Sequence, residues 1–351
     1  MRIGHKSLCY AECRVSLLII LLNRIRKLFH LCVLPLIVDI LFGIMLVLVT
    51  GATGNIGRYA VSSLLARGHQ VRILARNASS KLSPEILSRL EGIVQSTGYD
   101  DIGSLDHGCA GVDAIVNSYS GRPELTLDGQ LLLLRAAERA GVKRFVAACW
   151  SYDWTALHLG QHESYDPFIS FHNHVELTSD IRPIYILTGV FAEVFFAAPG
   201  HGDFSPRNHG CWDPQRKRLE IWGTGNEPWH WTTERDAAEF AAEIVQRDDA
   251  AEGGFWRLCS GVNTLREIAA VYETVKGIKL DIEVIGTAEE LRKRALQARR
   301  EGTRRNFWSY IGWFYQLFTV DGTWTLKTLD NEKLGLRTTT LQEFLQQHPS
   351  I

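Results

Sequence analysis

The sequence carries no excess of charge of either sign. Its 38 Lys and Arg residues nearly balance 39 Asp and Glu residues, which leaves a formal net charge of -1. Binding to nucleic-acid phosphates requires a concentrated basic face, so the charge balance gives no support for a nucleic-acid partner. The composition is instead that of an ordinary globular protein.

Paired cysteines and cysteine metal motifs are also missing. The seven cysteines stand singly, no two are arranged as CxxC, and their number is odd. Such a pattern argues against a disulfide framework and against a cysteine zinc site, and it favours a reducing compartment. We therefore expect a cytoplasmic location.

Methionine is scarce, because the chain has only Met1 and Met45. The apolar stretch that ends near Met45 is long enough to suggest a membrane span, which needs roughly 20 residues. However, the run LVLV at 46–49 has to supply the first buried strand, and an acidic residue interrupts the stretch. We interpret residues 1–44 as a leader outside the fold. The alternative is a membrane anchor that ends near Ile44, and it would be the only basis for membrane association.

The sequence that follows Met45 is typical of a dinucleotide-binding fingerprint. A continuous apolar run, MLVLV, leads into TGATGNIG, and a helical stretch and the second strand, QVRILAR, come next. The glycines permit a tight turn, let the backbone approach a pyrophosphate, and allow the helix to pack closely on its strand. The N-terminus of the helix presents free N–H groups to the phosphates. The predicted cofactor-binding residues of this loop are Thr50, Gly51, Thr53, Gly54, Asn55, Ile56 and Gly57.

The end of the second strand indicates which cofactor is bound. An NAD enzyme usually carries an acidic residue there, which binds the ribose 2′-hydroxyl, whereas an arginine accommodates the 2′-phosphate of NADP. This strand ends in Arg76 and Asn77, and no acidic residue is near. We therefore predict NADP(H), bound in part by these two residues. The alternative is a solvated arginine at a strand end.

Four motifs occur in the order typical of one known family. They are GATGNIG, GHQVRILAR, SLDHGCAGVDAIVNS and RAAERAGVKRFVAACWSYD. With them the chain resembles the NmrA-like branch of the atypical short-chain dehydrogenases/reductases, which includes isoflavone-reductase-like enzymes. The resemblance covers residues 45 to 346, and the downstream segments are similar to those of fungal members. It implies an NAD(P)-dependent oxidoreductase that acts on a small aromatic molecule, as in secondary metabolism.

Two groups that the resemblance implies near the nicotinamide are replaced in this chain. Isoflavone-reductase-like members carry a serine after the fifth strand and a lysine on the next helix, and alignment puts Ala148 and His172 at these positions. Phe168 stands where a classical YxxxK tyrosine would be. A histidine with an unperturbed pKa of about 6.5 exchanges a proton at neutral pH, so His172, or else Tyr165, is the predicted proton donor. Alternatively, His172 only hydrogen-bonds the cofactor ribose or a backbone carbonyl.

The stretch HLGQHESYDPFISFHNH is rich in histidine, which raises the question of a metal site. His158 and His162 have the i, i+4 spacing that places two imidazoles on one helix face. Gly160 weakens that helix, and HxxxHE matches neither zincin order. We therefore expect no metal, and we interpret the segment as a loop that lines the substrate cleft.

Tryptophan is absent from the first 149 residues, and all ten tryptophans lie at or after position 150. In doubly wound folds the later loops supply the pocket wall, outside the carboxyl ends of the strands. An aromatic-rich C-terminal half is compatible with a flat, apolar substrate held by stacking. The alternative is that most of these rings belong to the core. Our candidates for substrate contact are Trp150, Tyr152, His162 and Phe191.

These observations predict one α/β unit with a doubly wound, mostly parallel Rossmann sheet led by residues 46–50. Residues 45–186 would form the NAD(P)-binding core, and residues 187–351 a smaller C-terminal substrate-binding lobe. The predicted function is an NADPH-dependent reductase of an aromatic or polycyclic small molecule. The alternatives are an NADP-sensing regulator without turnover and a cofactor-assisted isomerase without net redox. Either enzyme needs a deep apolar cavity beside the nicotinamide, whereas a sensor needs an interaction face.

Overall fold

The computed structural model describes residues 43–78 and 81–351. The interpretation of residues 1–44 as a leader or a membrane anchor concerns a segment that, except for its last two residues, lies outside the described part. Within the described part, no helix is long and apolar enough to cross a membrane. Residues 45–351 form one compact unit.

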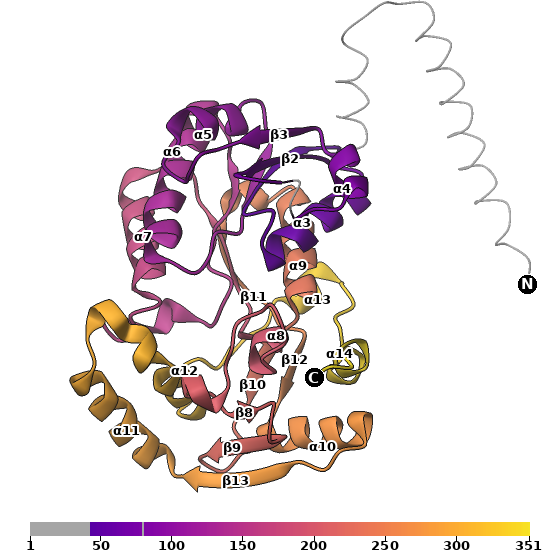
Figure 1. The fold of residues 1–351 in the computed structure, drawn as a ribbon. Coiled ribbons are helices and arrows are strands. Elements are labelled where there is room, and N and C mark those ends of the chain that lie inside the picture. Colours follow the sequence, from indigo (N-terminus) through magenta and orange to yellow (C-terminus); the bar gives the residue numbers. More distant parts are fainter. Residues whose placement is uncertain (1–42, 79–80) are drawn as a thin grey trace, which may run out of the picture. The chain divides into compact units, whose positions relative to one another are not determined.

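A seven-stranded sheet forms the centre of this unit (Figure 1), in the order β11-β6-β5-β4-β1-β2-β3. All neighbouring strands are parallel. The strands are β1 (Leu46–Thr50), β2 (Gln70–Ala75), β3 (Gly92–Gln95), β4 (Ala114–Asn117), β5 (Arg144–Val146), β6 (Ile184–Leu187) and β11 (Gly254–Arg257). Strand addition reverses between β1 and β4, which is the doubly wound order. The predicted Rossmann sheet led by residues 46–50 is therefore confirmed.

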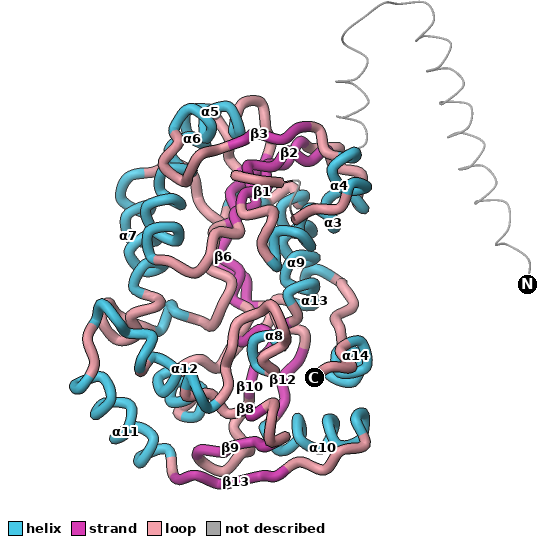
Figure 2. The backbone as a smooth tube through the Cα atoms, in the orientation of Figure 1, coloured by secondary structure: helices cyan, strands magenta, loops and turns pink. Residues whose placement is uncertain are grey.

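Helices cover both faces of the sheet (Figure 2). Successive side chains of a strand point to opposite faces, so Leu48 of β1 belongs to one core cluster, and Val47 and Val49 belong to another. The cluster with Val47 includes α3 (Asn55–Ala66) and α9 (Glu234–Gln246). The cluster with Leu48 includes α5 (Ile102–Cys109), α6 (Gln130–Ala140) and α7 (Asp166–Thr178). A strand buried on both faces has to be apolar throughout, which explains the run MLVLV.

The chain after β6 builds two small sheets and several helices. One sheet contains β7 (Val190–Phe191), β10 (Trp229–Thr232) and β12 (Gly261–Asn263), and the other contains β8 (Trp212–Asp213), β9 (Arg218–Trp222) and β13 (Asp281–Gly286). The helices are α8 (Ala192–Phe195), α10 (Leu265–Lys276), α11 (Ala288–Glu301), α12 (Ile311–Val320), α13 (Asn331–Leu334) and α14 (Leu341–Gln347), while α4 (Pro84–Arg89) precedes β3. The chain returns to the central sheet through α9 and β11, so the two predicted parts share one sheet.

We expect residues 45–351, expressed alone, to give a soluble protein that unfolds cooperatively. The reason is that the whole central sheet and both of its core clusters lie within this range. Circular dichroism during heating and a cofactor titration would measure folding and binding. An insoluble product would contradict the leader interpretation and favour the membrane anchor.

Candidate functional site

The loop between β1 and α3 leaves no room for side chains at two of its glycines. A Cβ at Gly57 would lie 2.2 Å from the carbonyl oxygen of Gly51, and a Cβ at Gly51 would lie 2.6 Å from that of Ser118. Gly51 also has a φ of +68°, which favours glycine. The end of β1, the start of α3 and the turn after β4 therefore meet at van der Waals contact. This is the tight turn and close helix–strand packing that the glycines of a dinucleotide-binding loop permit.

The N-terminus of α3 is open to an anion. Its N-cap, Gly54, makes no side-chain capping hydrogen bond, and the first turn contains no acidic residue. Because the first N–H groups of a helix have no partner within it, they are available to phosphate oxygens. The residues present thus fit the pyrophosphate of a dinucleotide.

The other predicted residues of this loop differ in their surroundings. Thr53 and Ile56 are partly exposed. Thr50 is fully buried, and its hydroxyl donates a hydrogen bond of 2.8 Å to Asn117 Oδ1, so its side chain holds the loop in place. The Nδ2 of Asn55 lies 3.3 Å from the carbonyl oxygen of Gly200, which brings residues 199–203 against the glycine loop.

Two acidic residues near Asn55, Glu193 and Glu234, are buried, and no pattern in the sequence predicts their burial. Glu234 Oε1 accepts a hydrogen bond of 3.3 Å from Asn55, and the backbone N–H of Glu234 donates to the carboxyl group of Glu193. Burial and the charge of Glu234 raise the pKa of Glu193 to about 8. Acidic residues are usually solvated, and only the packing of α9 on α3 shows that these two are enclosed.

Arg76 and Asn77 directly follow β2 and are exposed. The carboxyl ends of the parallel strands β1 and β2 meet at one edge of the sheet, so both residues lie beside the glycine loop. In doubly wound folds this is the position that contacts the 2′ substituent of the adenosine ribose.

A cavity of about 410 Å³ opens beyond the carboxyl ends of β5 and β6. Its size falls within the range of roughly 300–1,000 Å³ that is usual for small-molecule sites. The wall is formed by residues from four segments. They are Ser151 and Tyr152 after β5, Val190 and Phe191 of β7, Phe204 of the segment between α8 and β8, and Trp308, Ile311 and Tyr315 near and on α12. Most of these side chains are apolar or aromatic. Of the ten tryptophans only Trp308 is among the described lining residues, and seven others are buried in the core, so most of the rings are core residues, as the alternative interpretation held.

Two of the four candidates for substrate contact line the cavity. They are Tyr152 and Phe191. Trp150 is buried and donates its Nε1–H to the carbonyl oxygen of Asn117 at 3.0 Å, and His162 is fully enclosed behind the wall. Neither contributes to the lining formed by the described residues.

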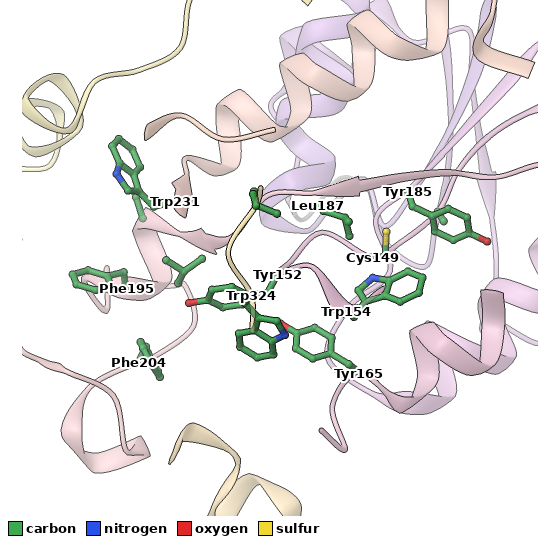
Figure 3. Close-up of a cluster of buried hydrophobic side chains, with 14 of the residues drawn as sticks. Cys149, Tyr152, Trp154, Tyr165, Tyr185, Leu187, Phe195, Phe204, Trp231 and Trp324 are labelled. Carbon is green, nitrogen blue, oxygen red and sulfur yellow. The ribbon is translucent and has the colours of Figure 1, made fainter. Parts of the chain in front are cut away.

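Tyr165 lies just behind the cavity wall. It is 1% exposed, and its hydroxyl shares a hydrogen bond with that of Ser151, which lines the cavity. Burial raises the pKa of Tyr165 well above 10, and the hydrogen bond with Ser151 opposes this shift. Trp324 packs against Tyr165 and stacks on Tyr152, with ring centroids 5.2 and 4.3 Å apart (Figure 3).

Tyr315 of α12 also lines the cavity. Its OH lies 3.0 Å from Ser164 Oγ, which lies 2.9 Å from His162 Nδ1. Burial, and secondarily the charge of Arg299, hold the pKa of His162 well below 6.5. Sequence reasoning missed Tyr315, because the stretch WFYQLF contains several aromatic residues and no local signal distinguishes the one that faces a cavity.

His172 and Ala148, the two residues aligned with the family's lysine and serine, are not among the described residues that line the cavity. His172 Nδ1 lies 3.4 Å from the hydroxyl of Tyr185, and its ring lies among Trp154, Tyr185 and Phe255. Ala148 is buried, and its backbone N–H donates to Gln130 Oε1 at 2.5 Å. No group of three or more possible metal ligands occurs among residues 43–78 and 81–351.

Curated proteins similar to this chain include reductases. A bifunctional pinoresinol-lariciresinol reductase from Linum perenne is 28% identical over 287 residues, which cover 78% of this chain and 86% of that protein. Pinoresinol reductase 2 from Arabidopsis thaliana is 29% identical over 218 residues, which cover 57% and 64%. These relatives are plant enzymes, so the similarity to fungal members stays a prediction.

Solved structures of similar proteins share the fold. The structure of AtPrR2 with NADP+ and (+)pinoresinol matches with a TM-score of 0.68 at 21% identity, over 87% of this chain and 99% of that one. An isoflavone reductase structure matches with a TM-score of 0.66 at 19% identity, over 87% and 99%. The model of the NmrA-like family matches residues 45–345. The chain therefore belongs to the NmrA-like family, in the branch of the isoflavone and pinoresinol reductases.

Proposed function

We propose that the protein is an NADPH-dependent reductase of an aromatic or polycyclic small molecule. The observation that carries the proposal is the apolar cavity at the carboxyl edge of the central sheet. The glycine loop lies at the same edge. The relatives support the proposal, because they include pinoresinol reductases and a leucoanthocyanidin reductase from Vitis vinifera solved with NADPH.

The cofactor in this proposal is NADP(H). The glycine loop and the open N-terminus of α3 would hold the pyrophosphate, and Arg76 and Asn77 would contact the 2′-phosphate. When bound, reduced nicotinamide supplies a hydride to the substrate. The protein then has to bind and orient the substrate, keep water away from the reacting carbon and deliver one proton.

The proton would come from the hydroxyl groups at the cavity rather than from His172. Ser151 and Tyr315 line the cavity, and Tyr165 is hydrogen-bonded directly behind Ser151. His172 is instead held among aromatic rings next to Tyr185. A proton donor has to come within hydrogen-bonding reach of the group that it protonates, so the geometry favours the hydroxyl groups.

A sensor without turnover is less well supported than an enzyme. Such a regulator needs an interaction face and has no use for an apolar cavity behind the strand ends. The cavity and its enclosed hydroxyl groups are the combination of apolar wall and few polar groups that orients a small ligand.

Arg76→Ala should weaken NADPH binding by about tenfold and leave NADH binding nearly unchanged. One charge-assisted hydrogen bond to the 2′-phosphate is worth about 1.4 kcal/mol at such an exposed position. Titration of cofactor fluorescence would measure both affinities. Arg182→Ala is the matched control, because Arg182 is an exposed arginine that precedes β6 at the opposite edge of the sheet. Tighter binding of NADH by the unaltered protein would rule out the 2′-phosphate contact.

The reductase proposal can be tested by screening quinones, enones and polycyclic phenols for NADPH oxidation. We expect at least one class to be reduced, with one NADPH consumed for each product molecule. Val194→Trp should lower kcat/KM by at least about tenfold without changing NADPH affinity, because the indole would fill the cavity that Val194 lines. Leu177→Trp is its control, since Leu177 is 85% exposed on α7. A rearranged product formed without NADPH loss would favour the isomerase instead.

His172→Ala should change turnover by less than about threefold. Its hydrogen bond to Tyr185 is long, at 3.4 Å, and the ring lies outside the cavity lining. Steady-state kinetics on a substrate found in the screen would decide. A loss of about 10² or more with unchanged NADPH affinity would restore His172 as the proton donor.

A further inference from the structure

Of the neighbouring tyrosines Tyr165 and Tyr315, only Tyr315 is among the described residues that line the cavity. Tyr165 lies behind Ser151, with which it shares a hydrogen bond. The rings of the two tyrosines pack with their centroids 5.8 Å apart. A ligand in the cavity can therefore reach Tyr315 directly.

The partners of Tyr315 leave its proton free for a ligand. His162 is neutral, because burial and the charge of Arg299 hold its pKa well below 6.5. Its Nε2 has no hydrogen-bond partner among the described residues, so an N–H there would be buried and unsatisfied. The favoured tautomer carries the proton on Nδ1 and donates to Ser164 Oγ, which directs the Ser164 hydrogen to the oxygen of Tyr315.

The contact with Ser164 also makes Tyr315 a better acid. Burial raises the pKa of Tyr315, whereas its hydrogen bond with Ser164 lowers it. A Ser164 hydroxyl that donates to the oxygen of Tyr315 stabilises a phenolate there.

We propose that Tyr315 transfers the proton to the substrate during reduction, and that Ser164 and His162 position it. The inference rests on the proposed reductase function, in which NADPH supplies the hydride. The O–H bond of Tyr315 breaks, and a bond to hydrogen forms on the substrate atom that holds the electron pair. The phenolate then takes a proton from water at the cavity mouth, where Trp308 is 55% exposed.

Tyr315→Phe should lower kcat by roughly 10²- to 10⁴-fold on a substrate found in the screen, with little change in NADPH affinity. Ser164→Ala should lower kcat by about tenfold, because it removes one hydrogen bond to the developing phenolate. Thermal unfolding of each variant checks the fold. Equal turnover of Tyr315→Phe and the unaltered protein would overturn the inference and leave the reductase proposal intact.

Fluorinated tyrosines at position 315 give a readout that a structural role would not move. Fluorine lowers the pKa of a phenol, so a fluorinated donor loses its proton at lower pH. The decrease of kcat at alkaline pH should therefore move to lower pH as the pKa of the substituted tyrosine falls. The groups that face Tyr315 are Tyr152, Tyr165 and His162, and Asp203 lines the same cavity. The same substitutions at position 165 should move this decrease much less. A decrease that follows position 165 instead would make Tyr165 the donor and refute the assignment.

A binding experiment separates this inference from the reductase proposal. The probe is 2-naphthol, a bicyclic phenol whose oxygen would accept the hydrogen bond of Tyr315, and calorimetry measures its affinity without turnover. Tyr315→Phe should weaken binding by about fivefold, the worth of one hydrogen bond of about 1 kcal/mol. Tyr272→Phe is the control, because Tyr272 is a buried tyrosine of α10 whose hydroxyl has no partner among the described residues.

The outcomes of the two experiments are distinct. Unchanged naphthol affinity in Tyr315→Phe would overturn the placement of Tyr315 at the substrate. Absence of NADPH oxidation with every compound would overturn the reductase function, whatever the naphthol result.

Discussion

The buried carboxylate of Glu163 joins the segment that precedes α7 to α11 and to the start of α12. Glu163 is 6% exposed, and it accepts hydrogen bonds of 2.9 Å from Arg299 of α11 and from the hydroxyl of Tyr310. The guanidinium of Arg299 lies 3.6 Å from the ring centroid of Phe314 on α12. Removing one partner of a buried ion pair leaves the other charge enclosed and unpaired, which is strongly unfavourable. The position of α12, and so of Tyr315, depends on this contact.

A single segment contacts both the glycine loop and the cavity. Gly200 and His201 lie against Asn55 of the glycine loop, whereas Gly202 and Phe204 line the cavity. The glycine loop itself is tightly packed, since Gly51 and Gly57 permit backbone contacts that any side chain would block. In our proposal a substrate in the cavity would lie near the carboxyl edge where the glycine loop lies, which is where doubly wound folds bind their ligands.

The sequence predicted the nucleotide-binding half well because its signals are local. A strand, a glycine loop and a helix follow one another, and the glycine spacing is visible within a few residues. The family, the doubly wound parallel sheet and the leading strand at 46–50 were predicted in this way and are confirmed. The place of Arg76 beside the loop follows from the parallel pairing of β1 with β2.

The catalytic half could not be predicted to the same depth, because its geometry depends on contacts between distant segments. Aligning His172 with the family's lysine fixes its position on α7, but the ring rotamer depends on Trp154 and Phe255. Ser164 and Tyr315 are 151 residues apart in the chain and meet only through the packing of α12. The periodicity of its apolar residues predicts that α12 is a packed helix. It does not indicate which polar side chains of other segments α12 contacts.

A site that holds its proton on hydroxyl groups differs physically from one that uses a lysine, the group that the family resemblance implies at position 172. A buried lysine or protonated histidine would have a large desolvation cost beside an apolar substrate. Hydroxyl groups and a neutral histidine avoid that cost, provided that each finds a hydrogen-bond partner. Ser151 and Tyr165 form one such neutral pair, and Tyr315, Ser164 and His162 form a neutral chain. In our proposal Tyr315 is the acid, because a hydroxyl group that donates to its oxygen stabilises the phenolate that proton transfer leaves.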